Sequence, residues 1–152
     1  MPRLVYLDFD EVLHPTSGKD LFCRMHLLEE ALIGKDCQII ISSSWRFHHP
    51  FKYLQSLFTE SLRGQVAGVT GGAFVGRWPR HSEILINVSK RATQGRWRAL
   101  DDSWSSQRTE LINDYPTKES TGATPVSVTL STSAIIVCIF EAAFWHPIDQ
   151  TR

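Results

Sequence analysis

The stretch LVYLDFDEVL, residues 4–13, decides the fold. Four apolar residues run without a break and stop at Asp8, which is typical of a strand buried on both faces of a parallel sheet. A second predicted strand, residues 38–41, has three isoleucines after Gln38 and stops at three consecutive serines, Ser42 to Ser44. Both predicted strands therefore end in polar side chains.

Helical spacing separates these strands. Between residues 21 and 33, Leu27, Leu28, Ala31 and Leu32 recur at helical intervals, and Gly34 can end the helix. Residues 51–62 predict a second helix, 66–69 a short strand, 82–88 a helix and 97–100 a strand. This alternation predicts an α/β fold, with a Rossmann-like parallel sheet in three layers and helices on both faces.

The whole chain has the size and composition of one domain. It has 152 residues, of which 42% are hydrophobic, so we expect a single domain over residues 1–152. Residues 1–104 form its clearest part, 105–133 are rich in Ser and Thr, and 134–145 predict a final strand or helix. Sixteen basic residues balance sixteen acidic ones, which argues against a protein that coats nucleic acid by bulk charge.

The sequence shows no targeting segment. The first eight residues already contain Asp8, and the apolar run at residues 134–140 is shorter than the roughly 20 residues that span a bilayer. We therefore expect a cytoplasmic protein.

Acidic residues follow two of the predicted strands. Asp8 and Asp10 follow the first, and Asp101 and Asp102 follow the strand at 97–100. If these strands are neighbours, their carboxylates meet at one edge of the sheet and need a cation between them. Mg²⁺, which favours oxygen ligands, is the natural choice. Asp and Ser after a strand also serve as helix caps and turn formers, which is the alternative interpretation.

Four segments together resemble the motifs of haloacid-dehalogenase-like (HAD) phosphohydrolases. Residues 4–13 resemble the first motif, Asp-x-Asp-Gly after a strand, and residues 39–43 resemble the second. Residues 80–84 are similar to the segment with the third-motif cation, and residues 97–102 resemble the fourth motif. More narrowly, residues 13–15, 42–46, 68–70 and 99–102 are similar to a small subgroup without a large cap, which includes the HAD domain of Swiss Army Knife RNA-repair proteins.

The resemblance implies a role for each matching residue. Asp8 would be the nucleophile that forms an aspartyl-phosphate, and Asp10 would be the general acid and base. Ser43 would hydrogen-bond a phosphate oxygen, and Arg80 would offset the charge on the transferring phosphoryl group. The resemblance also implies a Mg²⁺ ion, whose ligands would be drawn from Asp8, the Asp10 carbonyl, Asp101 and Asp102.

One residue departs from the family pattern. Glu11 stands where the family has Gly, a residue that permits an unusual backbone conformation close to metal and phosphate. Glu11 adds a negative charge that would weaken phosphate binding, unless its side chain points outward. The alternative to a phosphatase is therefore a weakly active or inactive HAD-like binding module. The sequence predicts that Glu11→Gly raises turnover.

The substrate class is suggested by an open site and by basic residues. Without a large cap, the site would accept a large substrate, such as a phosphorylated nucleic-acid end, or another phosphomonoester. Six basic residues form a candidate patch for such a partner; they are Arg77, Arg80, Lys90, Arg91, Arg96 and Arg98. The alternative is an ordinary solvated helix face.

Overall fold

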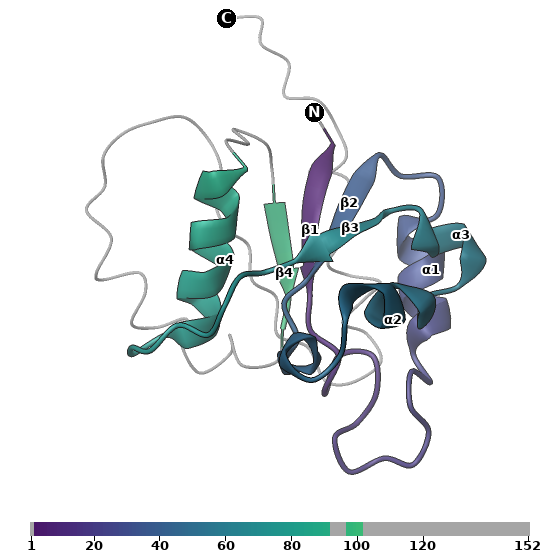
Figure 1. The fold of residues 1–152 in the computed structure, drawn as a ribbon. Coiled ribbons are helices and arrows are strands. Elements are labelled where there is room, and N and C mark those ends of the chain that lie inside the picture. The colour runs from purple at the N-terminus through teal and green to yellow at the C-terminus, as the bar shows by residue number, and fades with distance from the viewer. Residues whose placement is uncertain (1, 92–96, 102–152) are drawn as a thin grey trace, which may run out of the picture.

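The structure, a computed structural model, describes residues 2–91 and 97–101. Its centre is a sheet of four strands (Figure 1). The strands are β1 (Arg3–Leu7), β2 (Cys37–Ile41), β3 (Val66–Val69) and β4 (Trp97–Leu100). They lie in the order β3-β2-β1-β4, and every pairing is parallel. This arrangement confirms the predicted parallel sheet.

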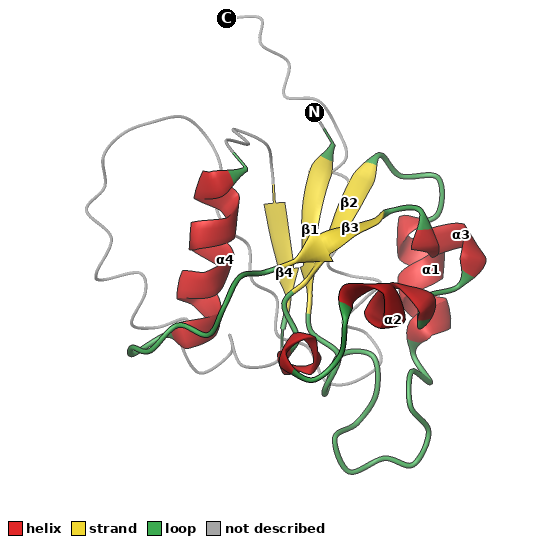
Figure 2. Ribbon diagram, viewed as in Figure 1, coloured by secondary structure: helices red, strands yellow, loops and turns green. Residues whose placement is uncertain are grey.

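Helices cover both faces of the sheet (Figure 2). The helices are α1 (Met25–Leu32), α2 (Phe51–Ser56), α3 (Glu60–Arg63) and α4 (Pro79–Lys90), together with the 3₁₀ helix η1 (Ser44–Phe47). The first three lie on one face and α4 lies on the other, so the fold is the predicted three-layer α/β architecture. Within the described residues, no helix is long and apolar enough to span a membrane.

The unbroken apolar strands are explained by burial on two faces. Side chains alternate along a strand, so Val5 and Leu7 point to one face and Leu4 and Tyr6 to the other. Val5 and Leu7 share a cluster with side chains of α1, α2 and α3. Leu4 and Tyr6 pack with Ile84 of α4. Residues 4–7 are therefore buried on both faces of the sheet, which explains the run of apolar side chains.

Three helices differ in extent from the prediction. The helix expected over 51–62 is two short helices, because Ser56 donates its hydroxyl to the Tyr53 carbonyl and Thr59 takes an extended ψ of 155°. The helix expected at 82–88 starts earlier, at Pro79, a residue that tolerates the first helical position. The helix expected from residue 21 starts at Met25, since Phe22 has a left-handed backbone with φ of 59°.

Strand β3 contains an irregularity that matters at its end. Ile39 pairs with Val66 but Ile40 pairs with Gly68, so β3 carries one extra residue, Ala67, between them. Such a bulge changes which residue of a strand faces each side of the sheet. The segments 105–133 and 134–145, for which the sequence predicts a Ser/Thr-rich stretch and a final element, lie outside the described residues.

Candidate active site

The four strands end in one row of polar residues. Asp8 follows β1, Ser42 follows β2, Thr70 follows β3 and Asp101 follows β4. Backbone hydrogen bonds of 2.9 Å keep the row in register, from the amides of Asp8, Ser42 and Thr70 to the last residue of the neighbouring strand. Across the sheet the order is therefore Thr70, Ser42, Asp8, Asp101.

The row faces helix α4. The residues just before it, including Leu7, Ile41 and Leu100, pack on the α1 face, so the next side chain on each strand turns the other way. Arg80, in the first turn of α4, confirms this direction. Its Nη2 lies 3.6 Å from Asp8 Oδ2, and its Nε lies 3.6 Å from Asp101 Oδ2. Arg80 thus bridges two carboxylates that are 93 residues apart in sequence.

The Asp8 carboxyl is buried in a strongly polar setting. Burial raises its pKa to about 6, and the negative charge of Asp101 acts in the same direction. Arg80, the Phe9 amide and the Ser43 hydroxyl lower the pKa and so favour the ionised form. The Phe9 amide donates to Asp8 Oδ1 at 2.8 Å. The carboxylate is therefore held in one orientation, and its charge is only partly compensated.

Three buried donors around the row have no hydrogen-bond partner among the described residues. The Ser42 hydroxyl, the Thr70 hydroxyl and Arg80 Nη1 are buried, and none has a hydrogen bond to any described residue. Leaving a buried donor unsatisfied costs about 1–3 kcal/mol, so such groups usually mark a position where something else binds. All three can donate to a common acceptor, and the charge of Arg80 favours a negatively charged one.

Asp10 lies beside this row, and its side chain contacts His14. Its Oδ1 lies 3.2 Å from Nε2 of His14, and its side chain is 36% exposed. Glu11 has a left-handed backbone with φ of 59°, the conformation that explains the family's Gly. Its carboxylate accepts a hydrogen bond of 2.8 Å from the Thr16 amide, in an exposed loop.

A cation would stabilise the Asp8 and Asp101 carboxylates. Burial and the charge of Asp101 both raise the pKa of Asp8, and Arg80 supplies only one positive charge to both carboxylates. No group of three or more His, Cys, Asp or Glu residues is gathered for a metal within residues 2–91 and 97–101. Asp102, the second member of the predicted acidic pair, lies outside those ranges. A metal held here would need further oxygen ligands, from a backbone carbonyl, from water or from Asp102.

A buried ion pair next to the site connects η1 with α4. Arg46 of η1 lies 2.5 Å from Glu83 of α4, and the side chains are 2% and 6% exposed. The same guanidinium donates to the carbonyls of Ser42, Ser43 and Gly71. Arg46 therefore ties the ends of β2 and β3 to helix α4, which carries Arg80.

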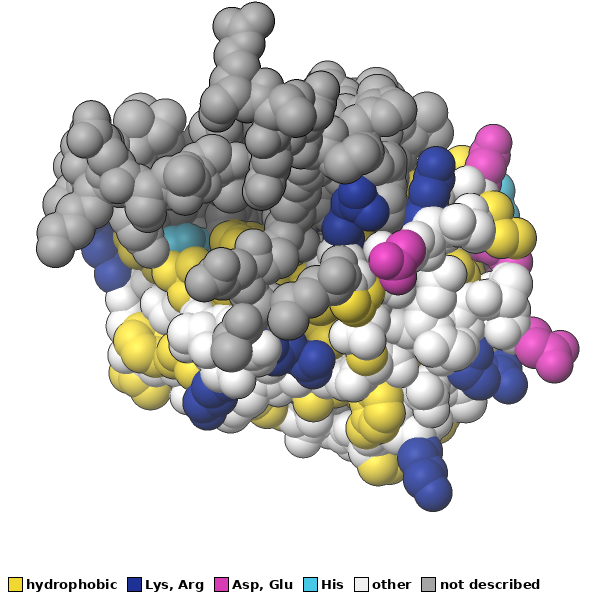
Figure 3. All heavy atoms as spheres, turned by 90° about the horizontal axis from the view of Figure 1, so that it is seen from above, with side chains coloured by type: hydrophobic (Ala, Val, Ile, Leu, Met, Phe, Trp, Pro, Cys, Tyr) yellow, Lys and Arg dark blue, Asp and Glu magenta, His cyan; other side chains and the backbone are white. Residues whose placement is uncertain are grey.

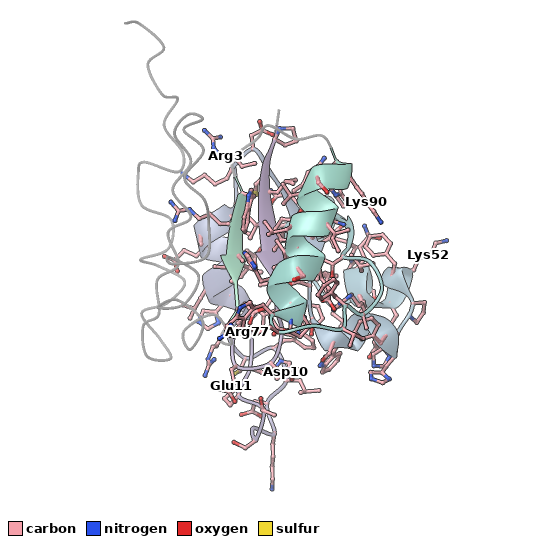
Figure 4. The ribbon with its side chains drawn as sticks, turned by 90° about the vertical axis from the view of Figure 1, so that its left-hand side faces the viewer. Arg3, Asp10, Glu11, Lys52, Arg77 and Lys90 are labelled. Atoms are coloured by element: carbon pink, nitrogen blue, oxygen red, sulfur yellow. The ribbon has the colours of Figure 1, made fainter. Side chains whose placement is uncertain are left out.

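The basic residues of the predicted patch that the structure describes do not lie together. Arg77 and Arg80 lie where the strands end, whereas Lys90 and Arg91 end helix α4 at its opposite end (Figure 4). Arg91 packs over β3, where a side chain at Gly68 would come within 3.0 Å of its guanidinium. Arg98 is in β4, and Arg96 lies outside the described residues. On the face at the amino ends of the strands, Lys and Arg side chains are spread singly wherever described residues are visible (Figure 3).

The structure thus brings together most of the residues that the sequence singled out. Asp8, Ser43, Arg80 and Asp101 share one site, with Asp10 at its border. Sequence reasoning assigned no role to Thr70, Arg46 or Glu83. Thr70 could have been found as the polar residue that ends the third strand, but the Arg46–Glu83 contact joins positions that no local pattern connects.

Comparison with known proteins supports the HAD family, which the sequence motifs resemble. The sequence matches the family described as the HAD domain in Swiss Army Knife RNA repair proteins, over residues 4–128. No curated protein and no solved structure matches the chain significantly. Because the family match covers most of the sequence and agrees with the fold, this chain belongs to the family of HAD domains found in Swiss Army Knife RNA repair proteins.

Proposed function

We propose that the protein is a phosphomonoester hydrolase that acts through Asp8. The observation that carries this proposal is a set of three buried donors beside the Asp8 carboxylate, from Ser42, Thr70 and Arg80, that have no partner in the described part of the chain. A phosphoryl group offers several negatively charged acceptors at once, and the N-terminal end of α4 adds a partial positive charge there. Membership of a HAD family supports hydrolase chemistry of the phosphatase type.

The proposed reaction has two steps. An oxygen of Asp8 attacks phosphorus and the bond to the leaving oxygen breaks, while Asp10 gives that oxygen a proton. Water then attacks the aspartyl-phosphate, Asp10 takes up a proton, and free phosphate and the Asp8 carboxylate are released. Arg80, with the Ser42 and Thr70 hydroxyls, would hold the phosphoryl oxygens, and Ser43 would orient Asp8.

We propose Mg²⁺ as the cofactor. Asp8, Asp101 and the backbone carbonyl of Asp10 would hold it, with Asp102 as a further candidate ligand. A bound Mg²⁺ would neutralise phosphate charge and relieve the repulsion between the Asp8 and Asp101 carboxylates. This proposal is supported by the geometry of the site, where the Asp8 and Asp101 carboxylates share the single positive charge of Arg80 at 3.6 Å each.

Release of phosphate from p-nitrophenyl phosphate tests the activity, with Mg²⁺ and with EDTA. We expect turnover that requires Mg²⁺ and that falls at least about a thousandfold in Asp8→Asn, since the nucleophile is lost. Phosphorylated oligonucleotides serve as the second substrate. If the wild type and Asp8→Asn release phosphate from both substrates at the same background rate, the proposal is wrong.

The rival function is a HAD-like module that binds a phosphorylated partner without hydrolysing it. Glu11 is the residue that raises this possibility, because it replaces the family's Gly directly after Asp10. Its carboxylate is engaged by the Thr16 amide, which favours the interpretation that it points away from phosphate. Binding of phosphate with no Asp8-dependent turnover would support the module.

A phosphorylated nucleic-acid end is the substrate that we propose. Arg77 and the adjacent Trp78 lie just before α4, at the end of the sheet that holds the site, with the Arg77 guanidinium 5.3 Å from the Trp78 ring centre. A cation and an aromatic ring so placed would contact the backbone and a base next to a terminal phosphate.

Binding of a fluorescent 5′- or 3′-phosphorylated single strand to Asp8→Asn tests this substrate. We expect Arg77→Ala to weaken binding and to lower the salt dependence by about one counterion. Lys90→Ala is the matched control, because Lys90 ends the same helix away from the site, and it should leave affinity unchanged. Equal effects of the two changes would show that the strand does not run past Arg77.

A further inference from the structure

His14 is a buried histidine in contact with the proposed proton carrier. It is 2% exposed, and its ring packs edge-on against Phe22, with 4.9 Å between ring centres, and in a tilted arrangement against Trp45, at 5.7 Å. Its Nε2 lies 3.2 Å from Asp10 Oδ1. An imidazole in such an apolar setting needs a partner for each ring nitrogen.

The second ring nitrogen determines where the proton lies. The Phe22 amide donates to His14 Nδ1 at 3.3 Å, so Nδ1 must be an acceptor and carries no hydrogen. A doubly protonated ring would bring two N–H donors face to face at this position. The hydrogen of the neutral ring is therefore on Nε2, and Nε2 donates to Asp10.

The backbone that supplies this amide is held in an uncommon conformation. Phe22 is one of two non-glycine residues with positive φ among those described, at 59°. A left-handed conformation costs a residue with a side chain about 1–2 kcal/mol. The Phe22 ring also packs against Phe9 and Trp45, so the strained residue is fixed by contacts on the same cluster.

We propose that His14 is a positioning residue for Asp10 in leaving-group protonation; this inference rests on the proposed function. With Oδ1 occupied by the Nε2–H of His14, a proton on the Asp10 carboxyl can reside only on Oδ2. The hydrogen bond thus keeps Oδ2 for the leaving oxygen and stops rotation of the side chain. Phe22 acts on Asp10 indirectly, because its amide selects the tautomer of His14.

Two substitutions separate the donor from the packing. In His14→Gln the side-chain amide nitrogen lies near the position of Nε2 and can still donate to Asp10. In His14→Asn the shorter side chain reaches only the position of Nδ1, so it keeps a partner for the Phe22 amide and loses Asp10. His49→Asn is the matched control, because His49 also packs on Trp45, at 5.5 Å between ring centres.

The leaving group decides between a positioning role and a structural one. Protonation matters for an alkyl leaving group, as in a 3′-phosphorylated oligonucleotide, and much less for p-nitrophenolate. For His14→Asn we expect kcat to fall about 10-fold to 100-fold on the oligonucleotide and less than about threefold on p-nitrophenyl phosphate. His14→Gln should recover the oligonucleotide reaction to within about threefold of wild type. Equal losses on both substrates, or no recovery in His14→Gln, would overturn the proposal.

A measurement on the wild-type protein covers the case in which the variants do not fold. Nitrogen-15 NMR of labelled histidine should show His14 as a neutral ring with its hydrogen on Nε2, assigned by contacts to the Phe22 ring. The opposite tautomer or a charged ring would refute the inference without any activity assay. If wild-type enzyme releases no phosphate, the proposed function and the role in protonation fail together, while the tautomer still tests the hydrogen bond.

Discussion

At the scale of single residues, Glu11 shows how one substitution can be structurally tolerated. Its backbone keeps the left-handed conformation that Gly adopts easily, with φ of 59°. Two contacts hold it there: its carboxylate accepts from the Thr16 amide, and its carbonyl accepts from Arg24 Nη1 at 2.7 Å. The lowered pKa of Glu11 has the Thr16 amide as its main cause.

Two variants of Glu11 separate charge from conformation. Glu11→Gln removes the charge and keeps the side-chain length; because the carboxylate is directed to Thr16, we expect kcat/KM to change less than about threefold. Glu11→Gly should raise the melting temperature by a few degrees at most, since it relieves the left-handed backbone and loses one exposed hydrogen bond. A rise in kcat/KM of tenfold or more in Glu11→Gln would show that the charge does repel phosphate. The same assay tests whether Glu11→Gly raises turnover.

Thr70 gives a prediction in which stability and binding move in opposite directions. Thr70→Val removes a buried hydroxyl that has no described partner and keeps the side-chain shape, so the free energy of unfolding should rise by about 1 kcal/mol. KM should rise about five- to tenfold, because one hydrogen bond to the phosphoryl group is lost. Chemical denaturation and steady-state kinetics measure the two effects, with Thr70→Ser as the control that keeps the hydroxyl. A less stable Thr70→Val protein would show that the hydroxyl has a partner.

At the scale of elements, the ion pair between Arg46 and Glu83 joins η1 to α4. Both side chains are buried, and Glu83 Oε1 also accepts from the Phe74 amide at 3.0 Å. Helix α4 presents Arg80 to the row of strand ends, so the pair fixes a catalytic candidate through the helix that carries it. Burial lowers the pKa of Arg46, while Glu83 raises it and keeps the pair charged.

Removing one partner should destabilise the protein strongly. We expect Glu83→Ala to lower the free energy of unfolding by about 3–5 kcal/mol, because it leaves the Arg46 guanidinium buried without a counter-charge. Glu60→Ala, at an exposed position in the first turn of α3, is the control and should cost less than about 1 kcal/mol. The double change Arg46→Met with Glu83→Leu should recover part of the loss. Equal midpoints for Glu83→Ala and Glu60→Ala would refute this account.

The elements differ in how far the sequence predicts them. Strands β1 and β2 are evident from unbroken apolar runs that stop at Asp8 and Ser42, because burial on both faces leaves a local signature. The break between α2 and α3 is not evident, since residues 51–62 keep an apolar spacing across it. The same limit applies to the site: strand-end carboxylates follow from topology, but the side-chain contacts of Arg46 and His14 depend on tertiary packing.

At the scale of the whole molecule, the sheet is enclosed by two apolar layers, and the layer beneath α4 contains the phenol side chain of Tyr6. Tyr6 is fully buried beneath α4, and its hydroxyl donates to Asn87 Oδ1 at 3.0 Å. Burial raises the pKa of Tyr6 to about 12, and the nearby positive charge of Arg91 lowers it. The ionised phenolate is therefore disfavoured in the folded protein.

The raised pKa of Tyr6 should make the free energy of unfolding depend on pH under alkaline conditions. A pKa raised from 10 in the unfolded chain to about 12 in the folded one gives stability that is present below pH 10 and lost as the pH rises through about 12. Tyr6→Phe cannot ionise, so its unfolding free energy should fall less steeply than that of wild type between pH 10 and 12. Guanidinium denaturation at pH 8, 10 and 11.5 measures the two slopes. Parallel curves would mean that Tyr6 does not contribute.

The bulge in β3 has a consequence for how the chain tolerates changes of length. Ala67 is accommodated outside the regular pairing, while Gly68 and Val69 resume it and bring Thr70 level with Ser42. Without Ala67 as an extra residue, Val69 would lie next to Ser42 in place of Thr70. The neighbourhood of Ala67 can therefore absorb an insertion or deletion upstream, and a protein engineer who alters the loop after α3 should expect the Thr70 hydroxyl to keep its place.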